Sequence, residues 1–465
     1  MLTFGRPARA IGNNFIHDST HGLDPISAST LVRINGYACV RWDNSSVVTG
    51  KGSVSDSQVV NWADRTPSND IYKVVDSSER TINAIRVNSV DSDSYLGSHY
   101  IEIDIDVGDL DVVLGNYIRL GTVASAVTVT HSDTTETEIG NKDVRVKVLS
   151  SSVATLGFQA ATSKTPVSVT LAGGTKWWYR THPVMPYEHQ VTITNSLKAD
   201  LWICIPFIAS DDYVRQLSLF LMDGLHSKAK VYLEYSNEVW NSERTFQYNH
   251  ALGKGSQVDA QIWTATRSGE IFDIFEEQWP LERLIRVFPG QSASTGVINN
   301  IFSNISHEKG DAIAIAPYFA EVVITSADDD IVDLLKRVEK TITDDAKVAM
   351  TNHYSVAKSK RLALISYGGG QHFTTDGSVD ALDFLTQANE REEMELNCYD
   401  PYLDMVKGNL LATDKIPVPV FVHYAHQGNP SNLGYWGVLR ASPDSITDRP
   451  KYRSIRKRLW PQEVY

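Results

Sequence analysis

The sequence predicts an α/β protein: a (β/α)8 TIM barrel interrupted by an inserted all-β, sandwich-like domain. Eight short apolar runs recur along the chain, and most are followed by a polar loop and a helical pattern. Apolar strands that alternate with helices are typical of a parallel sheet covered on both faces, and eight such units suffice to close a barrel. One segment instead alternates apolar and polar residues with a period of two, which is typical of an antiparallel sandwich.

The predicted barrel strands fall on either side of this inserted segment. They lie at 8–15, 37–44, 200–207, 230–239, 283–291, 311–319, 362–370 and 419–427. Helical patterns separate them, and the clearest, at 211–227, places Val214, Leu217, Leu221 and Leu225 on one stripe. Further helices are predicted at 328–342 and 378–396. We therefore assign residues 1–71 and 173–465 to the barrel.

The inserted β-rich domain is predicted at 72–172. Strict alternation marks runs such as YIEIDIDV at 100–107 and VRVKV at 144–148. This segment contains no tryptophan, so an aromatic platform for stacking sugars is poorly supplied. A spacer or assembly module, through which the chain would form a homo-oligomer or join a particle, is therefore favoured over a carbohydrate-binding module.

Composition and charge argue against several classes of function. The 465 residues carry a formal net charge of −13, which opposes a broad nucleic-acid interface. The three cysteines form no CxxC pair, no run approaches 18 apolar residues, and no HxH or HExxH spacing occurs. We expect no disulfide framework, no membrane span, no metal and no cofactor. No secretory leader is visible at the start, and we expect secretion or a virion surface.

Polar residues gather where the predicted strands end, and in a barrel these carboxyl ends form the site. The candidates are Arg41, Asp43, Asp211, Asn237, Glu238, Trp240, Tyr318, Tyr367, Gln371, His372, His423 and Trp436. They combine carboxylates with amides, imidazoles and aromatic rings, without a phosphate-binding loop. Such a lining suits an oligo- or polysaccharide, whose hydroxyls need donors and acceptors and whose apolar ring faces stack on indoles.

The run LEYSNEVWN at 233–241 resembles the acid/base strand of clan-A glycoside hydrolases. Together with NWADR at 61–65 and YGGGQH at 367–372, it resembles a group of cellulase-like barrel proteins that carry LEYSNEVWN and YEGGQH. The resemblance covers most of 200–440 and the NWADR region, and it leaves out the inserted domain. It implies a (β/α)8 barrel that acts on β-linked glycans.

The same resemblance implies roles for several candidates. Glu238 would be the general acid/base, which protonates the glycosidic oxygen and later activates water. Asn237 would bond the 2-hydroxyl of the sugar. Positioning would fall to Arg41 and Tyr318, and stacking on the sugar ring to Trp240 or Trp436.

The chain departs from the family pattern at Gly368, where the nucleophilic glutamate of YEGGQH is expected. A retaining glycosidase needs a second carboxylate about 5–5.5 Å from its acid, and glycine supplies none. Natural loss of the nucleophile, an engineered knock-out, or replacement by another carboxylate would each explain this. The replacement candidates are Asp43, Asp211, Asp212 and Asp376.

The sequence therefore predicts a glycoside-hydrolase-like protein that binds or cleaves a β-linked polysaccharide and is impaired or inactive as an enzyme. The alternative is a virion-associated or other structural protein that uses a catalytically dead barrel.

Overall fold

A computed structural model describes most of the barrel and parts of the chain before it. From Tyr187 to Leu459 it is complete except for residues 243–244, 256–258, 326–329, 377, 425–429, 431–433 and 440–448. Before Tyr187 it describes Ala8–Ala10, Cys39–Trp42, and strands with short turns between Arg80 and Arg180.

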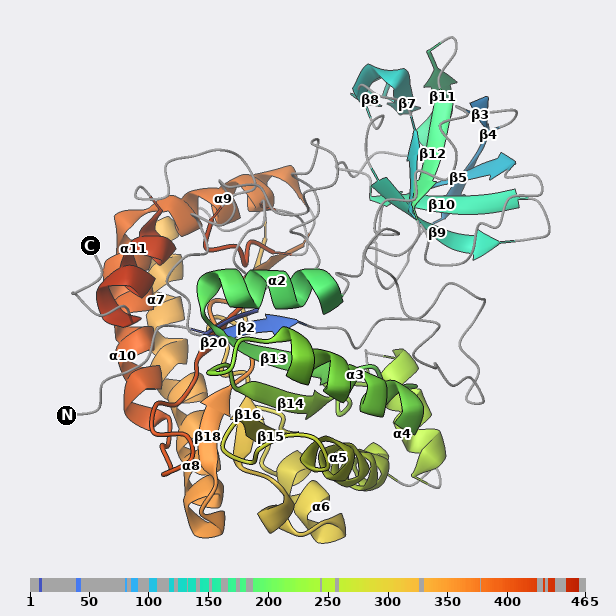
Figure 1. Cartoon of the computed structure of the whole chain (residues 1–465). Coiled ribbons are helices and arrows are strands. Elements are labelled where there is room, and N and C mark those ends of the chain that lie inside the picture. Colours follow the sequence, from blue (N-terminus) through green and yellow to red (C-terminus); the bar gives the residue numbers. More distant parts are fainter. Residues whose placement is uncertain are drawn as a thin grey trace.

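Eight parallel strands form a closed barrel, as the sequence predicts (Figure 1). They are β1 (Ala8–Ala10), β2 (Cys39–Trp42), β13 (Asp200–Ile205), β14 (Val231–Tyr235), β15 (Leu284–Pro289), β16 (Ala312–Ile315), β18 (Ala363–Ser366) and β20 (Val422–His423). From β1 to β18 each barrel strand pairs with the next, and β20 returns to pair with β1. A parallel bridge between Ser366 and Phe421 closes the last seam, where the Ser366 N–H donates to the Val420 carbonyl at 2.9 Å.

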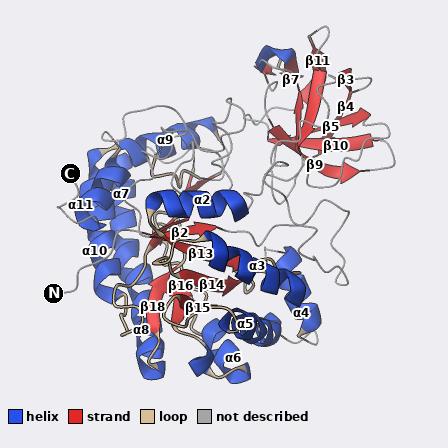
Figure 2. Ribbon diagram, in the orientation of Figure 1, coloured by secondary structure: helices blue, strands red, loops and turns tan. Residues whose placement is uncertain are grey.

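Helices cover the outside of the barrel between successive strands (Figure 2). The α-helices are α2 (Tyr187–Leu197), α3 (Asp211–Gly224), α4 (Thr245–Lys254), α5 (Ala260–Glu276), α6 (Gly296–Asn304), α7 (Ile331–Thr341), α8 (Lys347–Lys360), α9 (Val379–Glu390), α10 (Asp400–Asn409) and α11 (Pro450–Leu459). Shorter elements are η4 (His307–Lys309), the π-helical η5 (Ile342–Ala346) and η6 (Met394–Tyr399), and the paired strands β17 (Val323–Ile324) and β19 (Thr374–Thr375). None of the helices described is long and apolar enough to cross a membrane.

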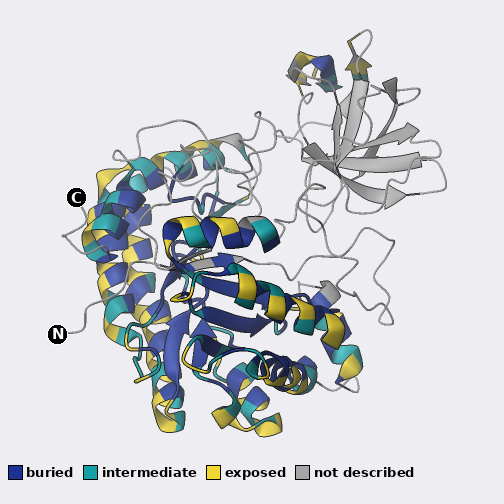
Figure 3. Ribbon diagram, in the orientation of Figure 1, coloured by how far each residue is buried: buried dark blue, intermediate teal, exposed yellow. Residues whose placement is uncertain are grey.

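Helix α3 shows how the local sequence sets these elements. Ser210 caps its start, because the hydroxyl oxygen accepts a hydrogen bond from the Tyr213 N–H at 3.0 Å. Asp211 and Asp212 follow in the first turn, where negative charge interacts favourably with the helix dipole. The buried stripe contains Val214, Leu217 and Leu221, and the opposite face is exposed (Figure 3). The helix predicted at 211–227 is thus confirmed, and it ends at Gly224.

Alternate residues of the barrel strands belong to two separate apolar layers. In β13, Ile203 packs outward with the helices, whereas Trp202 belongs to an inner cluster made almost entirely of strand residues. In β14, Leu233 faces outward and Tyr232 inward in the same way. Because side chains alternate with a period of two along a strand, Glu234 also lies inside the barrel.

Among the residues described between β2 and β13, there are ten strands. They are β3 (Arg80–Thr81), β4 (Ile85–Val90), β5 (Tyr100–Asp106), β6 (Tyr117–Leu120), β7 (Val127–His131), β8 (Glu136–Glu138), β9 (Asp143–Leu149), β10 (Val153–Gln159), β11 (Pro166–Leu171) and β12 (Lys176–Arg180). They form a seven-stranded and a three-stranded antiparallel sheet, and in the described residues none pairs with a barrel strand. Strand β12 extends this pairing to Arg180, and the domain boundaries at 72 and 172 stay a prediction.

Candidate functional site

The fourth barrel strand, β14, turns sharply at its carboxyl end. All five of its residues are buried, and the Ser236 N–H continues the ladder by donating to the Ile205 carbonyl at 2.8 Å. Ser236 and Glu238 then adopt positive φ angles of 55° and 49°. This region costs a residue other than glycine about 1–3 kcal/mol, and such strain concentrates at functional sites. The strained turn carries Asn237 and Glu238 beyond the strand.

Asn237 is held from two sides. Its side-chain oxygen accepts a hydrogen bond from Nη2 of Arg41 at 2.9 Å, and its backbone carbonyl accepts one from Nε2 of Gln247 at 3.0 Å. Only 4% of Asn237 and 4% of Arg41 are exposed. The Arg41 guanidinium also lies over the Tyr367 ring, 5.1 Å from its centroid. The structure therefore brings together Arg41, Asn237 and Tyr367, which were predicted from three separate strands.

Glu238 interacts electrostatically with Tyr318 and Tyr367. Its Oε2 atom accepts a hydrogen bond from Nδ2 of Asn241 at 3.3 Å. Burial raises the pKa of the Tyr318 hydroxyl well above its usual value, and the Glu238 carboxylate raises it further. The same two causes, in the same order, raise the pKa of Tyr367. Both phenols therefore stay neutral, and the Tyr367 hydroxyl donates to the Gly290 carbonyl at 3.4 Å.

Gly368 follows β18 and faces the same Tyr318 hydroxyl. A Cβ atom at position 368 would lie 2.8 Å from the Tyr318 hydroxyl oxygen and 3.3 Å from Cβ of Ala316. Any side chain at 368 would thus begin next to the Tyr318 ring. The Tyr318 hydroxyl, whose pKa the Glu238 charge raises, therefore lies against the position assigned to the missing nucleophile.

A row of aromatic rings continues from Tyr318. His372 lies edge-on to Tyr318 with ring centroids 5.3 Å apart, Trp436 is 5.9 Å from His372, and Tyr424 is 6.3 Å from Trp436. Within the described residues, the buried Nε1 atoms of Trp240 and Trp436 have no hydrogen-bond partner. An aromatic wall with N–H donors suits a sugar ring, which stacks through its apolar face and bonds through its hydroxyls.

Two predicted binding residues, Gln371 and His423, are buried and hydrogen-bonded to other residues of the barrel. Gln371 is fully buried, and its amide bonds the Phe373 N–H at 2.7 Å, the Asn389 side chain at 3.1 Å and the Tyr435 carbonyl. His423 is 2% exposed and bonds the Tyr399 hydroxyl at 2.9 Å. Burial and these bonds hold both side chains in place near the loop that carries Gly368, and their contact with a substrate stays a prediction.

The candidate replacement carboxylates are engaged elsewhere. Asp211 pairs with Arg267 at 2.6 Å, and Asp376 accepts hydrogen bonds from Ser378 in the turn before α9. Asp212 is exposed on the first turn of α3. Asp211 as a binding residue stays a prediction, since its side chain remains 64% exposed. Asp43 lies outside the described residues.

Glu234 was missed by the sequence reasoning, although it lies four residues before Glu238. It is fully buried, and its Oε2 atom accepts hydrogen bonds from Arg41 at 2.9 Å and from the Trp202 indole at 2.7 Å. A lone carboxylate within the apolar run VYLEY was the available signal, because a buried charge needs a partner.

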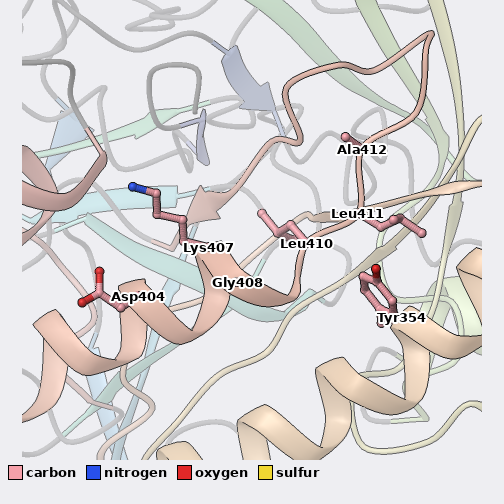
Figure 4. Close-up of a pocket in the computed structure, with 7 residues that line it drawn as sticks. All are labelled: Tyr354, Asp404, Lys407, Gly408, Leu410, Leu411 and Ala412. Atoms are coloured by element: carbon pink, nitrogen blue, oxygen red, sulfur yellow. The ribbon is translucent and has the colours of Figure 1, made fainter. Parts of the chain in front are cut away.

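A separate hollow of about 520 Å³ lies outside this site (Figure 4). Its lining comes from α8, from α10 and from the loop after α10: Tyr354, Asp404, Lys407, Gly408, Leu410, Leu411 and Ala412. Leu411 bridges to Leu364 near the start of β18, whereas Gly368 lies beyond the end of that strand. None of the predicted site residues lines the hollow. Among the residues that the structure describes, no group of three or more histidine, cysteine or acidic side chains is placed to hold a metal ion.

Fold and site together define a (β/α)8 barrel with a strained Asn–Glu turn at the end of its fourth strand. No family model and no curated protein matches the chain. It is similar to solved structures of a Cellulomonas fimi endo-beta-1,4-mannanase double mutant (10% identity, 60% of this chain and 59% of that chain, TM-score 0.35) and a Thermotoga maritima beta-glucosidase (10% identity, 60% and 78%, TM-score 0.32). A third is xylanase10C from Cellvibrio japonicus (8% identity, 82% and 96%, TM-score 0.28).

The match spans less than two thirds of the mannanase chain. At these identities and TM-scores the likeness carries no argument, and any function is argued from the site.

Proposed function

We propose that the protein binds a β-linked oligo- or polysaccharide at the carboxyl end of its barrel, with the acid/base Glu238 retained and the nucleophile lost at Gly368. The observation that supports this most is that position 368 lies against the hydroxyl of Tyr318, whose pKa is also raised by the charge of the Glu238 carboxylate. A retaining glycosidase needs two carboxylates on opposite sides of the scissile bond, about 5–5.5 Å apart. One position here carries a carboxylate and the other carries glycine.

Chemically, such a site binds glycans better than it cleaves them. Glu238 can still protonate a glycosidic oxygen, but no covalent intermediate can form at Gly368. Asp211 is committed to Arg267, and Glu234 is fully buried, so neither substitutes readily for a nucleophile. We expect the wild-type chain to bind sugars through the aromatic row and to hydrolyse them slowly or not at all.

The variant Gly368→Glu tests the catalytic half of this proposal. The tyrosine hydroxyl that a Cβ would meet is the far end of a side chain, so it can move to admit the new carboxylate. We expect hydrolysis of 4-nitrophenyl β-glycosides, β-1,4-glucan, mannan or xylan to rise at least 100-fold over wild type. Adding Glu238→Gln should abolish the gain, because removing the acid removes a contribution of about 10²–10⁴-fold.

Gly408→Glu is the matched control. It adds the same side chain on α10, at a position where a Cβ atom would have no neighbouring atom within 4 Å. It should leave activity at the wild-type level. A folded Gly368→Glu protein that gains no activity on any of these substrates contradicts the retaining-type assignment. Titration calorimetry with cellohexaose, mannohexaose and xylohexaose tests binding, and a stable oligomer without affinity for any of them would favour the structural alternative.

A further inference from the structure

The buried pair Glu234–Arg41 lies directly beneath the Asn237–Glu238 turn. Glu234 is the inward-facing residue of β14 and is completely buried among apolar strand side chains. A charge in this position is costly unless it is paired and hydrogen-bonded. Burial raises the pKa of the Glu234 carboxyl, and the Arg41 charge opposes that rise.

All of the hydrogen bonds recorded for Glu234 converge on one oxygen. Oε2 accepts from Nη2 of Arg41 at 2.9 Å, from Nε of Arg41 at 3.3 Å, from the Trp202 indole at 2.7 Å and from the Cys204 thiol at 3.5 Å. Within the part of the chain that the structure describes, Oε1 has no hydrogen-bond partner. Glu234 therefore acts chiefly as the anchor and counter-ion of Arg41.

Arg41 links Glu234 to Asn237. The same Nη2 atom that bonds Glu234 also donates to the side-chain oxygen of Asn237 at 2.9 Å. A guanidinium has donors and no acceptor, so only one orientation of the Asn237 amide can bond to it. The oxygen must face Arg41, and the NH2 group must face away from it. The Trp202 and Tyr367 rings, 5.5 Å and 5.1 Å from the guanidinium carbon, limit its movement.

We propose that Glu234 is a positioning residue, which acts through Arg41 to fix the amide orientation of Asn237 and so presents an N–H donor to the ligand. This inference rests on the proposed function only for the identity of the ligand, a sugar hydroxyl that accepts the hydrogen bond. A donor fixed in this way discriminates against sugars that lack the accepting hydroxyl, because such sugars cannot form this hydrogen bond.

The first test observes the amide directly and needs no sugar. In protein labelled with 15N-asparagine, the side-chain NH2 signals of Asn237 are assigned by their loss in Asn237→Asp. We expect Glu234→Gln to shift these signals. Asp311→Asn should leave them in place, although it removes the carboxylate from another buried pair, Arg286–Asp311, whose atoms lie 2.8 Å apart. Unshifted Asn237 signals in Glu234→Gln overturn the proposal.

Arg41→Lys covers the case in which Glu234→Gln does not fold. It keeps the positive charge but lacks the planar fork that reaches two partners. It should also shift the Asn237 signals, and unshifted signals there again overturn the proposal.

The second test measures binding of cellohexaose and mannohexaose by calorimetry. Glu234→Gln should weaken the affinity about tenfold, and Asp311→Asn less than twofold, as befits the loss of about one oriented hydrogen bond. If wild type binds but Glu234→Gln binds equally well, the positioning role is wrong. If the Asn237 signals shift while wild type binds neither sugar, the proposed function fails and the positioning of Asn237 stands.

Discussion

Alanine substitutions in the three consecutive glycines after β18 should destabilise the protein to very different extents. Gly368→Ala places its Cβ 2.8 Å from the Tyr318 hydroxyl oxygen, so that oxygen must shift, and it is the far end of its side chain. The φ angle of Gly368 lies outside the left-handed region, so alanine is not strained there. Since alanine also restricts the unfolded chain, worth about 0.4–1 kcal/mol, we expect the free energy of unfolding to change by less than about 1 kcal/mol.

Gly369→Ala and Gly370→Ala should lower the free energy of unfolding more than Gly368→Ala does. A Cβ at 369 would lie 2.6 Å from both the Phe421 ring and the Tyr402 hydroxyl, and overpacking of this kind costs about 1–3 kcal/mol. Gly370 has a φ of 119°, and its Cβ would lie 2.6 Å from Nε2 of His423. Backbone strain of about 1–3 kcal/mol then adds to overpacking of similar size, for a total of about 2–6 kcal/mol.

Urea unfolding followed by tryptophan fluorescence measures this order through the midpoint and slope of the transition. The expected loss in the free energy of unfolding rises from Gly368→Ala to Gly369→Ala to Gly370→Ala. A Gly368→Ala protein as unstable as Gly370→Ala would show that position 368 has no room for a side chain. The reasoning that places a carboxylate there would then be refuted.

Three further predictions concern the barrel that carries the site. Burial raises the pKa of Asp311, but its bonds with Arg286 outweigh this and hold the pKa below its usual value. The pair therefore stabilises the fold above about pH 4, and it does so less as the pH falls. The urea midpoint should drop more between pH 5 and pH 3 in wild type than in Asp311→Asn, and equal drops would contradict this. Arg267→Met should lower the free energy of unfolding by about 1–3 kcal/mol in the same assay, because it removes the donor that now bonds the Ala209 carbonyl at 2.9 Å. A change under 0.5 kcal/mol would argue that this hydrogen bond does not stabilise the fold. Phe288→Ala should lower the free energy of unfolding by about 3–5 kcal/mol, since the ring is fully buried and packs 5.4 Å from another phenylalanine ring; a loss under 1 kcal/mol would mean that the core there is not close-packed.

Most of the fold could be predicted because it depends on local patterns. Each barrel strand is a short apolar run, and a run such as AIAI in β16 is buried at every position whichever strand it pairs with. The amphipathic stripe of α3 and its Ser210 cap are likewise written in consecutive residues. Such signals need no knowledge of distant contacts, so the eight strands fall where they were expected.

The candidate site was only partly predictable, because contacts between distant residues decide which side chains face a ligand. Gln371 and Asp211 both follow predicted strands, as Glu238 does, but the sequence could not show that they bond Asn389 and Arg267. Glu234 shows the opposite case. Its partner Arg41 is 193 residues away in the sequence, so no local pattern joins the two.

The sequence by itself determined which groups are chemically present: an Asn–Glu pair at the end of one strand, and glycine where a second carboxylate is expected at 368. Only the tertiary structure decided how these groups meet. Closure of the barrel puts position 368, after β18, against the Tyr318 hydroxyl, and it pairs Glu234 of β14 with Arg41 of β2. The physical reason is that residue identity is covalent and local, whereas burial, pairing and amide orientation arise from packing between strands that lie far apart in the chain.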